Sequence, residues 1–249
     1  MKIPAAQKNV FVYAGPGASK FCVKETMVMM DDLGLGERML VLREPSSLIE
    51  ALSKQSEGIL VMPGGRDKPY QECLSGEGIA CIKTFVSLGG SYLGICAGAY
   101  FASGRVLFEP GTDMEVDEER ELGFFPGTAY GTLFSKAFEY NGEGGASAAN
   151  LGVFGPGQLQ LYYNGGCAFR GAENFENVEI LARYEEVEGR PAAVIKTEFG
   201  HGTVVLSGVH WEVGAVGARG LGTPQQVVQA LETWDQTRRE FAAMLVTSL

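Results

Sequence analysis

Short apolar runs alternate with amphipathic stretches through the first hundred residues. The apolar runs are rich in β-branched and aromatic residues, and the segments between them repeat apolar residues at helical spacing. This alternation is typical of an α/β fold, with a mostly parallel central sheet and helices on both faces. The predicted strands are Val10–Tyr13, Met39–Leu42, Gly58–Met62 and Ser91–Ile95, and the predicted helices are Ser19–Leu33, Ser46–Lys54 and Ile79–Leu88.

The carboxyl ends of these strands are predicted to form one edge of the sheet. Right-handed crossovers place successive parallel strands side by side with the same direction. Ligands of open parallel sheets bind at the edge where the strands end. We therefore expect the functional residues to follow these strands directly in the sequence.

The second half of the chain has a different pattern, because strand-like runs follow one another with turns between them. This pattern predicts an antiparallel or mixed C-terminal elaboration of the sheet. The glycine-rich segment Asn141–Gly157 has few large side chains and is predicted to be a mobile surface loop. A final helix is expected from Pro224 to Leu249. The strand-like runs are Gln160–Tyr163, Val178–Tyr184, Ala192–Thr197 and Thr203–Val209.

Length and composition narrow the class of protein. A chain of 249 residues with 45% hydrophobic residues can bury one full core, so we expect one domain over residues 1–249. The net charge of −10 would repel a phosphate backbone, so no nucleic-acid partner is expected. No apolar run is long enough to span a membrane, and Val10–Tyr13 is too short for a signal-peptide core, so no membrane partner is expected.

Five cysteines occur without a C-x-x-C pair or a regular spacing. This arrangement indicates neither a disulfide framework nor a zinc site, and it favours a reducing cytoplasm. We expect no bound metal and no cofactor. Four of the cysteines are interpreted as structural residues: Cys22, Cys73, Cys81 and Cys167.

The fifth cysteine follows a predicted strand in the pattern Gly94-x-Cys96-x-Gly98. A nucleophile on a strand-to-helix turn has a strained backbone, and its neighbours must be small for strand and helix to approach closely. The start of the helix would stabilise a thiolate, and the N–H of Ala97 would point toward an oxyanion. A cysteine beside glycines is also common in cores, so this pattern alone leaves a structural role for Cys96 open.

A histidine and a glutamate two residues apart lie at the end of a β-prone run, as His210 and Glu212. Residues two apart on a strand point to the same side, so both would face one site if the chain stays extended through Trp211. Glu212 would orient the imidazole, His210 would take the thiol proton, and Cys96 would attack. The predicted catalytic residues are therefore Cys96, His210 and Glu212.

A second glycine turn follows the predicted strand that ends at Met62. In Pro63-Gly64-Gly65, small residues would let the backbone approach a bound carbonyl group. We expect Gly65 and Ala97 to donate the two N–H groups of an oxyanion hole. Gly64 is expected to permit the turn and to belong to the substrate-binding residues. The alternative is a tight strand-to-helix connection without a ligand.

Two further polar segments are candidates for the substrate-binding wall. Asp67 and Tyr70 follow the glycine turn and are expected to line the mouth of the site. The run from Tyr162 to Gly166 combines aromatic, amide and glycine residues, and it is either a site-forming loop or an ordinary Asn-Gly hairpin turn. The residues of this run assigned to substrate binding are Tyr163, Asn164 and Gly165.

Several of these segments together resemble the N-terminal domain of eukaryotic-type biotin–protein ligases, a member of the class I glutamine amidotransferase-like superfamily. The similarity extends from about Val10 to Glu212 and implies a flavodoxin-like α/β fold. The residues contain no Gly-Arg-Gly-x-x-Gly loop of the kind that a biotin ligase uses, and His-Trp-Glu replaces the His-Pro-Glu of familiar amidotransferases. The matching segments are Pro63–Gly65 with Asp67 and Tyr70, Tyr92–Ser103, Arg120–Gly127, Tyr163–Gly166 and Ser207–Glu212.

Two functions follow from these observations. The first is a cysteine-dependent hydrolase or acyl transferase of the amidotransferase type, which would act on an amide or another small molecule through Cys96, His210 and Glu212. The second is a non-catalytic regulatory module, which would bind a metabolite or a protein partner in the same pocket and keep the three residues as a vestige. Biotin ligation itself is not expected, because the ligase loop is missing from these residues.

Overall fold

The computed structural model describes residues 8–134, 138–153 and 157–249. Thirteen strands of these residues belong to one sheet. The strands are β1 Val10–Tyr13, β2 Met39–Leu42, β3 Ile59–Met62, β4 Ser91–Ile95, β5 Ser103–Phe108, β6 Val116–Glu119, β7 Phe125–Gly131, β8 Ser147–Val153, β9 Gly157–Tyr163, β10 Ala168–Arg170, β11 Val178–Tyr184, β12 Ala192–Phe199 and β13 Gly202–Ser207. The helices are α1 Lys20–Asp32, α2 Pro45–Ser53, α3 Asp67–Leu74, α4 Glu77–Ser87, α5 Ala97–Phe101, α6 Ala215–Leu221, α7 Gln225–Thr233 and α8 Asp235–Thr247, with short 3-10 turns at Gly36–Arg38 and Ala172–Asn174.

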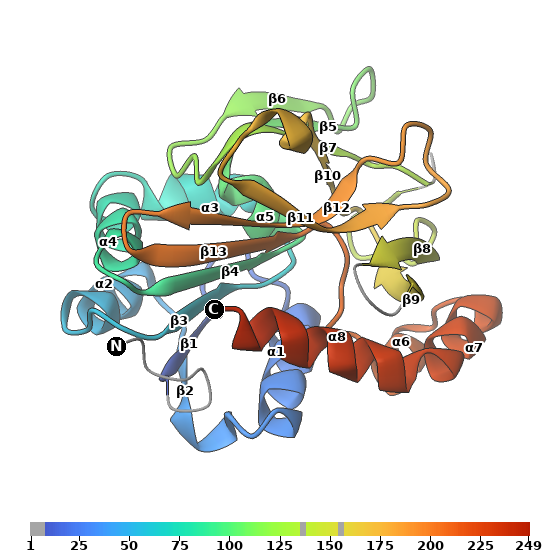
Figure 1. The fold of residues 1–249 in the computed structure, drawn as a ribbon, viewed down its shortest axis with the longest axis horizontal. Helices are drawn as coiled ribbons and strands as arrows, with labels where there is room; N and C mark the ends of the chain where they lie inside the picture. The colour runs from blue at the N-terminus through green and yellow to red at the C-terminus, as the bar shows by residue number, and fades with distance from the viewer. Residues whose placement is uncertain (1–7, 135–137, 154–156) are drawn as a thin grey trace.

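The central part of the sheet is parallel, as the alternating pattern predicts. Strands lie in the order β2-β1-β3-β4-β13, and every neighbouring pair in this group is parallel. Helices α1 and α8 cover one face of this group, and α2 to α5 cover the other (Figure 1). The predicted strands and helices of the first half are confirmed, with bounds that are identical or differ by one or two residues.

Alternate residues of the central strands enter two separate cores. Phe11 and Tyr13 of β1 pack with α2 to α5, whereas Val10 and Val12 pack with α1 and α8. Both sets are buried because a strand points successive side chains to opposite faces. Burial of each such side chain contributes about 1.5–3 kcal/mol to folding. This double burial explains why the strands of the first half have nearly continuous apolar sequences.

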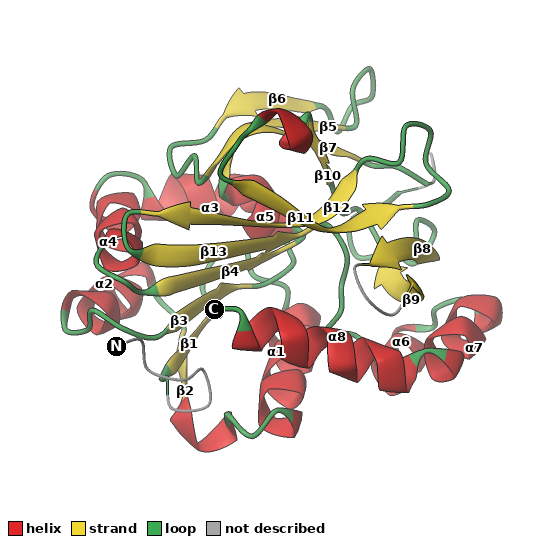
Figure 2. Ribbon diagram, in the orientation of Figure 1, coloured by secondary structure: helices red, strands yellow, loops and turns green. Residues whose placement is uncertain are grey.

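The C-terminal elaboration is mixed, as the turn-connected strands predict. Strand β12 pairs antiparallel with β13, β11 and β10, and the sheet continues from β10 through β7 and β5 to β6 (Figure 2). Strand β13 joins the two parts of the sheet, because it pairs parallel with β4 and antiparallel with β12. This strand ends at Ser207, three residues before His210.

The segment Asn141–Gly157 is not the loop that its glycine content predicts. Its residues Ser147–Val153 form strand β8, which pairs with β9 and β11, and its residues 154–156 lie outside the described part of the chain. Ala149, Leu151 and Val153 are buried at every second position. This alternation is the signature of a strand with one buried face, and small residues and glycine concealed it.

Two elements near the ends of the predicted segments also differ from expectation. The expected final helix is divided at Trp234 into α7 and α8, with Trp234 outside helical geometry and Asp235 opening α8. The residues after Gly65 form helix α3 rather than a loop, with Asp67 in the first turn. An acidic residue in a first turn interacts favourably with the helix dipole, which explains why the helices begin at these aspartates.

Within the described residues, no helix combines the length and the apolar composition needed to cross a bilayer.

Close packing between helix α5 and the sheet predicts that Gly98 cannot be enlarged. A Cβ atom at Gly98 would overlap the carbonyl oxygen of Met62, whereas one at Gly220 of α6 would meet nothing within 4 Å. We expect Gly98→Ala to lower the free energy of unfolding by roughly 1–3 kcal/mol through overpacking. The control Gly220→Ala, one residue before the end of α6, should raise it by at most about 0.5–1 kcal/mol, because alanine has a higher helix propensity than glycine. Denaturant unfolding of both variants measures the difference, and equal stabilities would contradict this packing.

Candidate functional site

Cys96 lies at a sharp turn between β4 and α5. Its φ of 50° and ψ of −105° are rare for a residue with a side chain, and such a conformation costs about 1–3 kcal/mol. Its backbone N–H donates to the carbonyl of Ser207 at 2.8 Å, which fixes the turn to β13. The predicted strand-to-helix turn is therefore present, and Cys96 is buried there, with 6% of its surface exposed. Its strain is consistent with a functional constraint on this position.

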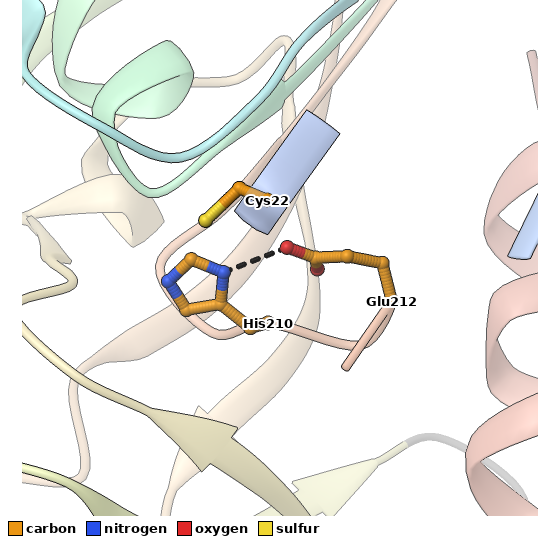
Figure 3. A group of neighbouring side chains, drawn as sticks. All are labelled: Cys22, His210 and Glu212. Atoms are coloured by element: carbon orange, nitrogen blue, oxygen red, sulfur yellow. Dashed lines mark hydrogen bonds and ion pairs between the residues drawn. The ribbon is translucent and has the colours of Figure 1, made fainter. Parts of the chain in front are cut away.

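His210 and Glu212 form a direct buried contact, in which His210 Nδ1 lies 2.7 Å from Glu212 Oε1 (Figure 3). The pair does not arise from an extended chain, as the sequence interpretation assumed. His210 makes an isolated antiparallel bridge with Tyr162, and the chain then turns, with Val213 N donating to His210 O at 3.3 Å. The turn brings the carboxylate back to the imidazole, so the two residues meet through a turn and not through the alternation of a strand.

The surroundings of His210 favour its charged form. Burial by itself lowers the pKa of His210, but the negative charge of Glu212, a negative charge at Cys96, and hydrogen-bonding interactions with Cys22 and Cys96 outweigh it. The net pKa of His210 is well above its ordinary value. An imidazole with these neighbours can accept a thiol proton and hold it beside the thiolate.

Arg238 of α8 holds the turn that contains the pair, and no pattern in the sequence pointed to it. Its Nη1 donates to the carbonyl of Trp211 at 2.9 Å, while Nε and Nη2 donate to Asp235 Oδ1 at 3.0 and 2.6 Å. The guanidinium is almost fully buried. Because an unpaired buried charge is costly, the paired Arg238 fixes the position of α8 relative to the His210–Glu212 turn.

Cys96 and His210 line one cavity of about 830 Å³ at the carboxyl edge of the sheet. This volume is in the range of small-molecule sites. Exposed residues such as Lys20 and Arg66 form its rim, and the guanidinium of Arg66 lies 4.2 Å from the ring centre of Tyr140. The cavity is therefore open to solvent at the rim and ends at the thiol.

The two predicted oxyanion donors, Gly65 and Ala97, both lie beside Cys96 in the wall of a smaller adjoining cavity. Gly65 has a φ of 150°, and a Cβ atom there would overlap the carbonyl oxygen of Gly17, so glycine is required. The adjacent Arg66 N–H donates to Gly17 O at 2.9 Å. Within the described part of the chain, no acceptor is paired with the N–H of Gly65, which is consistent with a donor reserved for a ligand.

Gly64 does more than permit the turn, because it lies directly against the side chains of His210 and Cys22. A Cβ atom at this position would lie 2.6 Å from His210 Cε1 and 2.8 Å from Cys22 Sγ. The carbonyl of Gly64 accepts a hydrogen bond from Ser19 N at 2.9 Å. Glycine at position 64 therefore makes room for the imidazole and for the side chain of Cys22.

Asp67 and Tyr70 have different positions, although both were expected at the mouth. The carboxylate of Asp67 lines the smaller cavity and accepts from Arg120 Nη2 at 2.7 Å and Nε at 2.9 Å. Burial raises the pKa of Asp67, against the lowering effect of Arg120. Tyr70 does not line the mouth: it is fully buried in the core, and its hydroxyl donates to Pro63 O at 3.0 Å. The helical geometry of α3 turns Tyr70 inward.

The Tyr162–Gly166 run forms part of the cavity, but Tyr163 does not line it. Tyr163 is buried, with its hydroxyl donating to Gly166 O at 2.8 Å and accepting from Leu133 N at 2.8 Å. The cavity instead contains Tyr162, whose ring packs edge-on against His210 at 5.7 Å between centroids. Neighbouring strand residues point to opposite faces, so an error of one position selects the wrong tyrosine.

Asn164 and Gly165 lie where the sequence predicted, at the wall around Cys96. The amide nitrogen of Asn164 donates to Gly142 O at 2.9 Å and to the Tyr162 hydroxyl at 3.3 Å. Its Oδ1 is buried without a hydrogen-bond partner among the described residues. A buried acceptor without a partner costs about 1–3 kcal/mol, so a donor from a ligand would be favourable there.

Cys22 is the one cysteine that the sequence interpretation placed in the core and the structure places at the site. It lies near the start of α1 and lines the same cavity as Cys96 and His210. Burial raises the pKa of the Cys22 thiol, while a hydrogen-bonding interaction with His210 lowers it. No local sequence signal marks this residue, because the contact joins α1 to a turn nearly two hundred residues away.

Comparisons with known proteins agree with this architecture. Residues 8–249 match the family model described as biotin-protein ligase, N terminal. An uncharacterized protein of Chlamydia muridarum is 40% identical over 209 residues, which cover 82% of this chain and 80% of that protein. A biotin–protein ligase of Schizosaccharomyces pombe is 39% identical over 216 residues, which cover 84% of this chain. The matched region spans only 34% of that ligase.

A solved structure of a glutamine amidotransferase has the same fold. It matches with a TM-score of 0.57 at 18% identity, over 86% of this chain and 99% of that one. The mostly parallel sheet with helices on both faces is therefore an amidotransferase-like α/β fold, as the sequence predicted. The family model and the two relatives together show that the chain belongs to the family of biotin–protein ligase N-terminal domains.

Proposed function

We propose that this protein is a cysteine-dependent hydrolase or acyl transferase of the amidotransferase type. The observation that supports the proposal is the buried 2.7 Å contact between His210 Nδ1 and Glu212 Oε1, beside a cavity that ends at the strained Cys96 turn. A nucleophile, a base and a residue that orients the base are the three parts that covalent acyl transfer requires. Its fold is also that of a glutamine amidotransferase.

In the proposed reaction the proton of the Cys96 thiol is held on His210, so that the nucleophile is a thiolate beside a charged imidazolium. Because Nδ1 is bonded to Glu212, the nitrogen free to accept the proton is Nε2. The thiolate sulfur attacks the carbonyl carbon of an amide or ester, and the N–H groups of Gly65 and Ala97 donate hydrogen bonds to the resulting oxyanion. His210 returns the proton to the leaving nitrogen or oxygen, and a thioester forms. Water or an amine then attacks the thioester and releases the thiol.

The chemistry of the cavity indicates a small polar substrate. Asn164 Oδ1 would accept a hydrogen bond from the substrate, which would remove the cost of a buried acceptor without a partner. Glu143 lines the same cavity and is already held by the hydroxyls of Tyr162 and Thr223. We propose an amide-containing small molecule as the substrate, with glutamine as the first compound to assay. A protein partner would accept the ammonia or acyl product.

The proposed location is the cytoplasm. All five cysteines are free thiols in the structure, and a reducing compartment keeps them in that state. A free Cys96 is required for the proposed attack, because a thiol in a disulfide cannot act as the nucleophile.

The first prediction concerns the reactivity of Cys96. We expect intact-mass measurements to show rapid alkylation of this residue by iodoacetamide near neutral pH. His210→Asn should slow the reaction by roughly a hundredfold or more, because general-base assistance contributes about 10²–10⁴-fold. Glu212→Gln should also slow it, because the amide removes the charge that stabilises the imidazolium.

The matched control is Cys81→Ser, which removes a cysteine in α4 that packs against Ile49 and lies away from the cavity. This variant should retain the wild-type rate at Cys96. Equal alkylation rates in wild type, His210→Asn and Glu212→Gln would contradict the proposal. That result would favour the regulatory binding module, in which the three residues perform no reaction.

The second prediction concerns the protonation of His210. Its raised pKa means that the folded state binds this proton more tightly than the unfolded state. The His210–Glu212 pair should therefore stabilise the fold fully below about pH 6.5, the ordinary histidine pKa. This contribution should be lost as the pH rises through the pKa that His210 has in the folded state. Histidine NMR should show a charged His210 above about pH 6.5.

The variant Glu212→Gln should lower the pKa of His210 relative to wild type. Without the carboxylate charge, burial would hold the pKa of His210 below its wild-type value, so the neutral imidazole would persist to lower pH. The chain has two histidines, so His201→Gln assigns the two resonances. An unchanged His210 titration in Glu212→Gln would show that the carboxylate does not control the base.

A further inference from the structure

Three side chains that can bind a metal lie close together near the proposed nucleophile. The Cys22 sulfur, a ring nitrogen of His210 and a carboxylate oxygen of Glu212 all lie within 4.8 Å of one another. Figure 3 shows the Cys22 sulfur directed toward the imidazole, with the Glu212 carboxylate beside the same ring. The three residues come from the start of α1 and from the turn after β13, so only the folded chain brings them together.

The ligand types match one class of cation. Thiolate, imidazole and carboxylate are the groups that bind zinc in proteins. One thiolate and one carboxylate would balance the two positive charges of the ion, so the complex would add no net charge to the buried site. This neutrality favours a divalent thiophilic cation over a monovalent ion or a second proton.

An orphaned polar atom provides an independent observation. Glu212 Oε2 is buried, with no hydrogen-bond partner among the described residues, although Oε1 is bonded to His210. An unpaired carboxylate oxygen in a buried site is costly. A cation at the cluster would give this carboxylate the additional partner that the protein does not provide.

The position of Cys22 is fixed by the surrounding chain. Ser19 caps α1, with its side chain accepting from Cys22 N at 3.5 Å, and Gly64 leaves the space that both sulfur and imidazole occupy. Cys22 also lines the cavity that opens to solvent beyond Cys96. Cys22 is therefore held in place, and two of the three ligands, Cys22 and His210, are reachable from the cavity.

We propose that Cys22, His210 and Glu212 bind a divalent thiophilic cation, represented by zinc, and that this cation inhibits the enzyme. The inhibitory part rests on the proposed function, because the ion would occupy the base and its orienting residue. On binding, the Cys22 thiol releases its proton to solvent, and a protonated His210 releases one of its two. The neutral imidazole keeps its remaining proton on the ring nitrogen that does not bind the metal, and bonds to the metal replace the hydrogen bond between His210 and Glu212. The fourth position would face the cavity, where water or the Cys96 thiolate could occupy it.

The sequence did not predict a metal site, and the physical reason is plain. Recognisable zinc sequences place pairs of ligands a few residues apart on one turn. Here only His210 and Glu212 are close in the sequence, and Cys22 joins them through tertiary packing. A search of the sequence for paired cysteines therefore finds nothing at this position.

Direct zinc titration tests the site without any assay of activity. The full chain, stripped of metal and kept reduced with a phosphine, would be titrated against a chromophoric zinc chelator. We expect one tight equivalent in wild type and in the control Cys81→Ser. Cys22→Ser, nearly identical in size, should weaken zinc binding by at least about a hundredfold, because even loss of a supporting outer-shell group costs 10–100-fold. Cys22→Ala gives a second variant should the serine perturb the fold.

The same samples separate this inference from the proposed function. Zinc should slow the alkylation of Cys96 in wild type and in Cys81→Ser, and the same zinc concentration should not slow it in Cys22→Ser. If Cys96 is unreactive even without zinc, the proposed function fails, while the titration still decides the metal site. Equal zinc affinities of wild type and both Cys22 variants, or no binding at all, would overturn the inference.

Discussion

The contact between His210 Nδ1 and Glu212 Oε1 is the interaction on which the candidate site depends. Both groups are almost fully buried, and removing an ion from water costs several kcal/mol even after the protein relaxes. The pair is maintained because its charges compensate one another and because Arg238 holds the intervening backbone from α8. The C-terminal helix is therefore part of the support of the site, although it contributes no group to the cavity.

A second constraint is steric and concerns the carboxyl edge of the sheet. Gly64, Gly65 and Gly98 each occupy a position where a Cβ atom would overlap a neighbouring group. These close approaches allow the Cys96 turn, the Pro63–Gly65 segment and the imidazole of His210 to lie close together in one small volume. The same lack of space explains the strained backbone of Cys96, since the strand must enter the helix without room for a wider turn.

The fold and the site contribute different kinds of information. The amidotransferase-like fold, which a solved glutamine amidotransferase structure shares, places functional residues at the sheet edge but does not determine a reaction. The reaction is inferred from the residues of the site. One residue of the site, Cys22, is not needed for acyl transfer by a cysteine, a histidine and a glutamate. Cys22 gives His210 a second thiol neighbour, so the imidazole lies among groups that suit both proton transfer and metal binding.

The sequence by itself determined the local features of this protein. Runs of β-branched residues located the central strands, glycine spacing located the Cys96 turn, and the separation of His210 from Glu212 identified a pair that the structure brings together. Each of these signals lies within a few residues of chain. Strand β8 was missed because alanine and glycine weakened its alternating pattern.

Only the tertiary structure decided which side chains face the cavity. Tyr162 lines it while Tyr163 and Tyr70 are enclosed, because strand pairing and helix rotation determine the direction of each side chain. Cys22 and Arg238 reach the His210–Glu212 turn from opposite ends of the sequence. Such contacts depend on how whole helices and strands pack against the sheet. The local pattern of residues along the chain does not predict that packing.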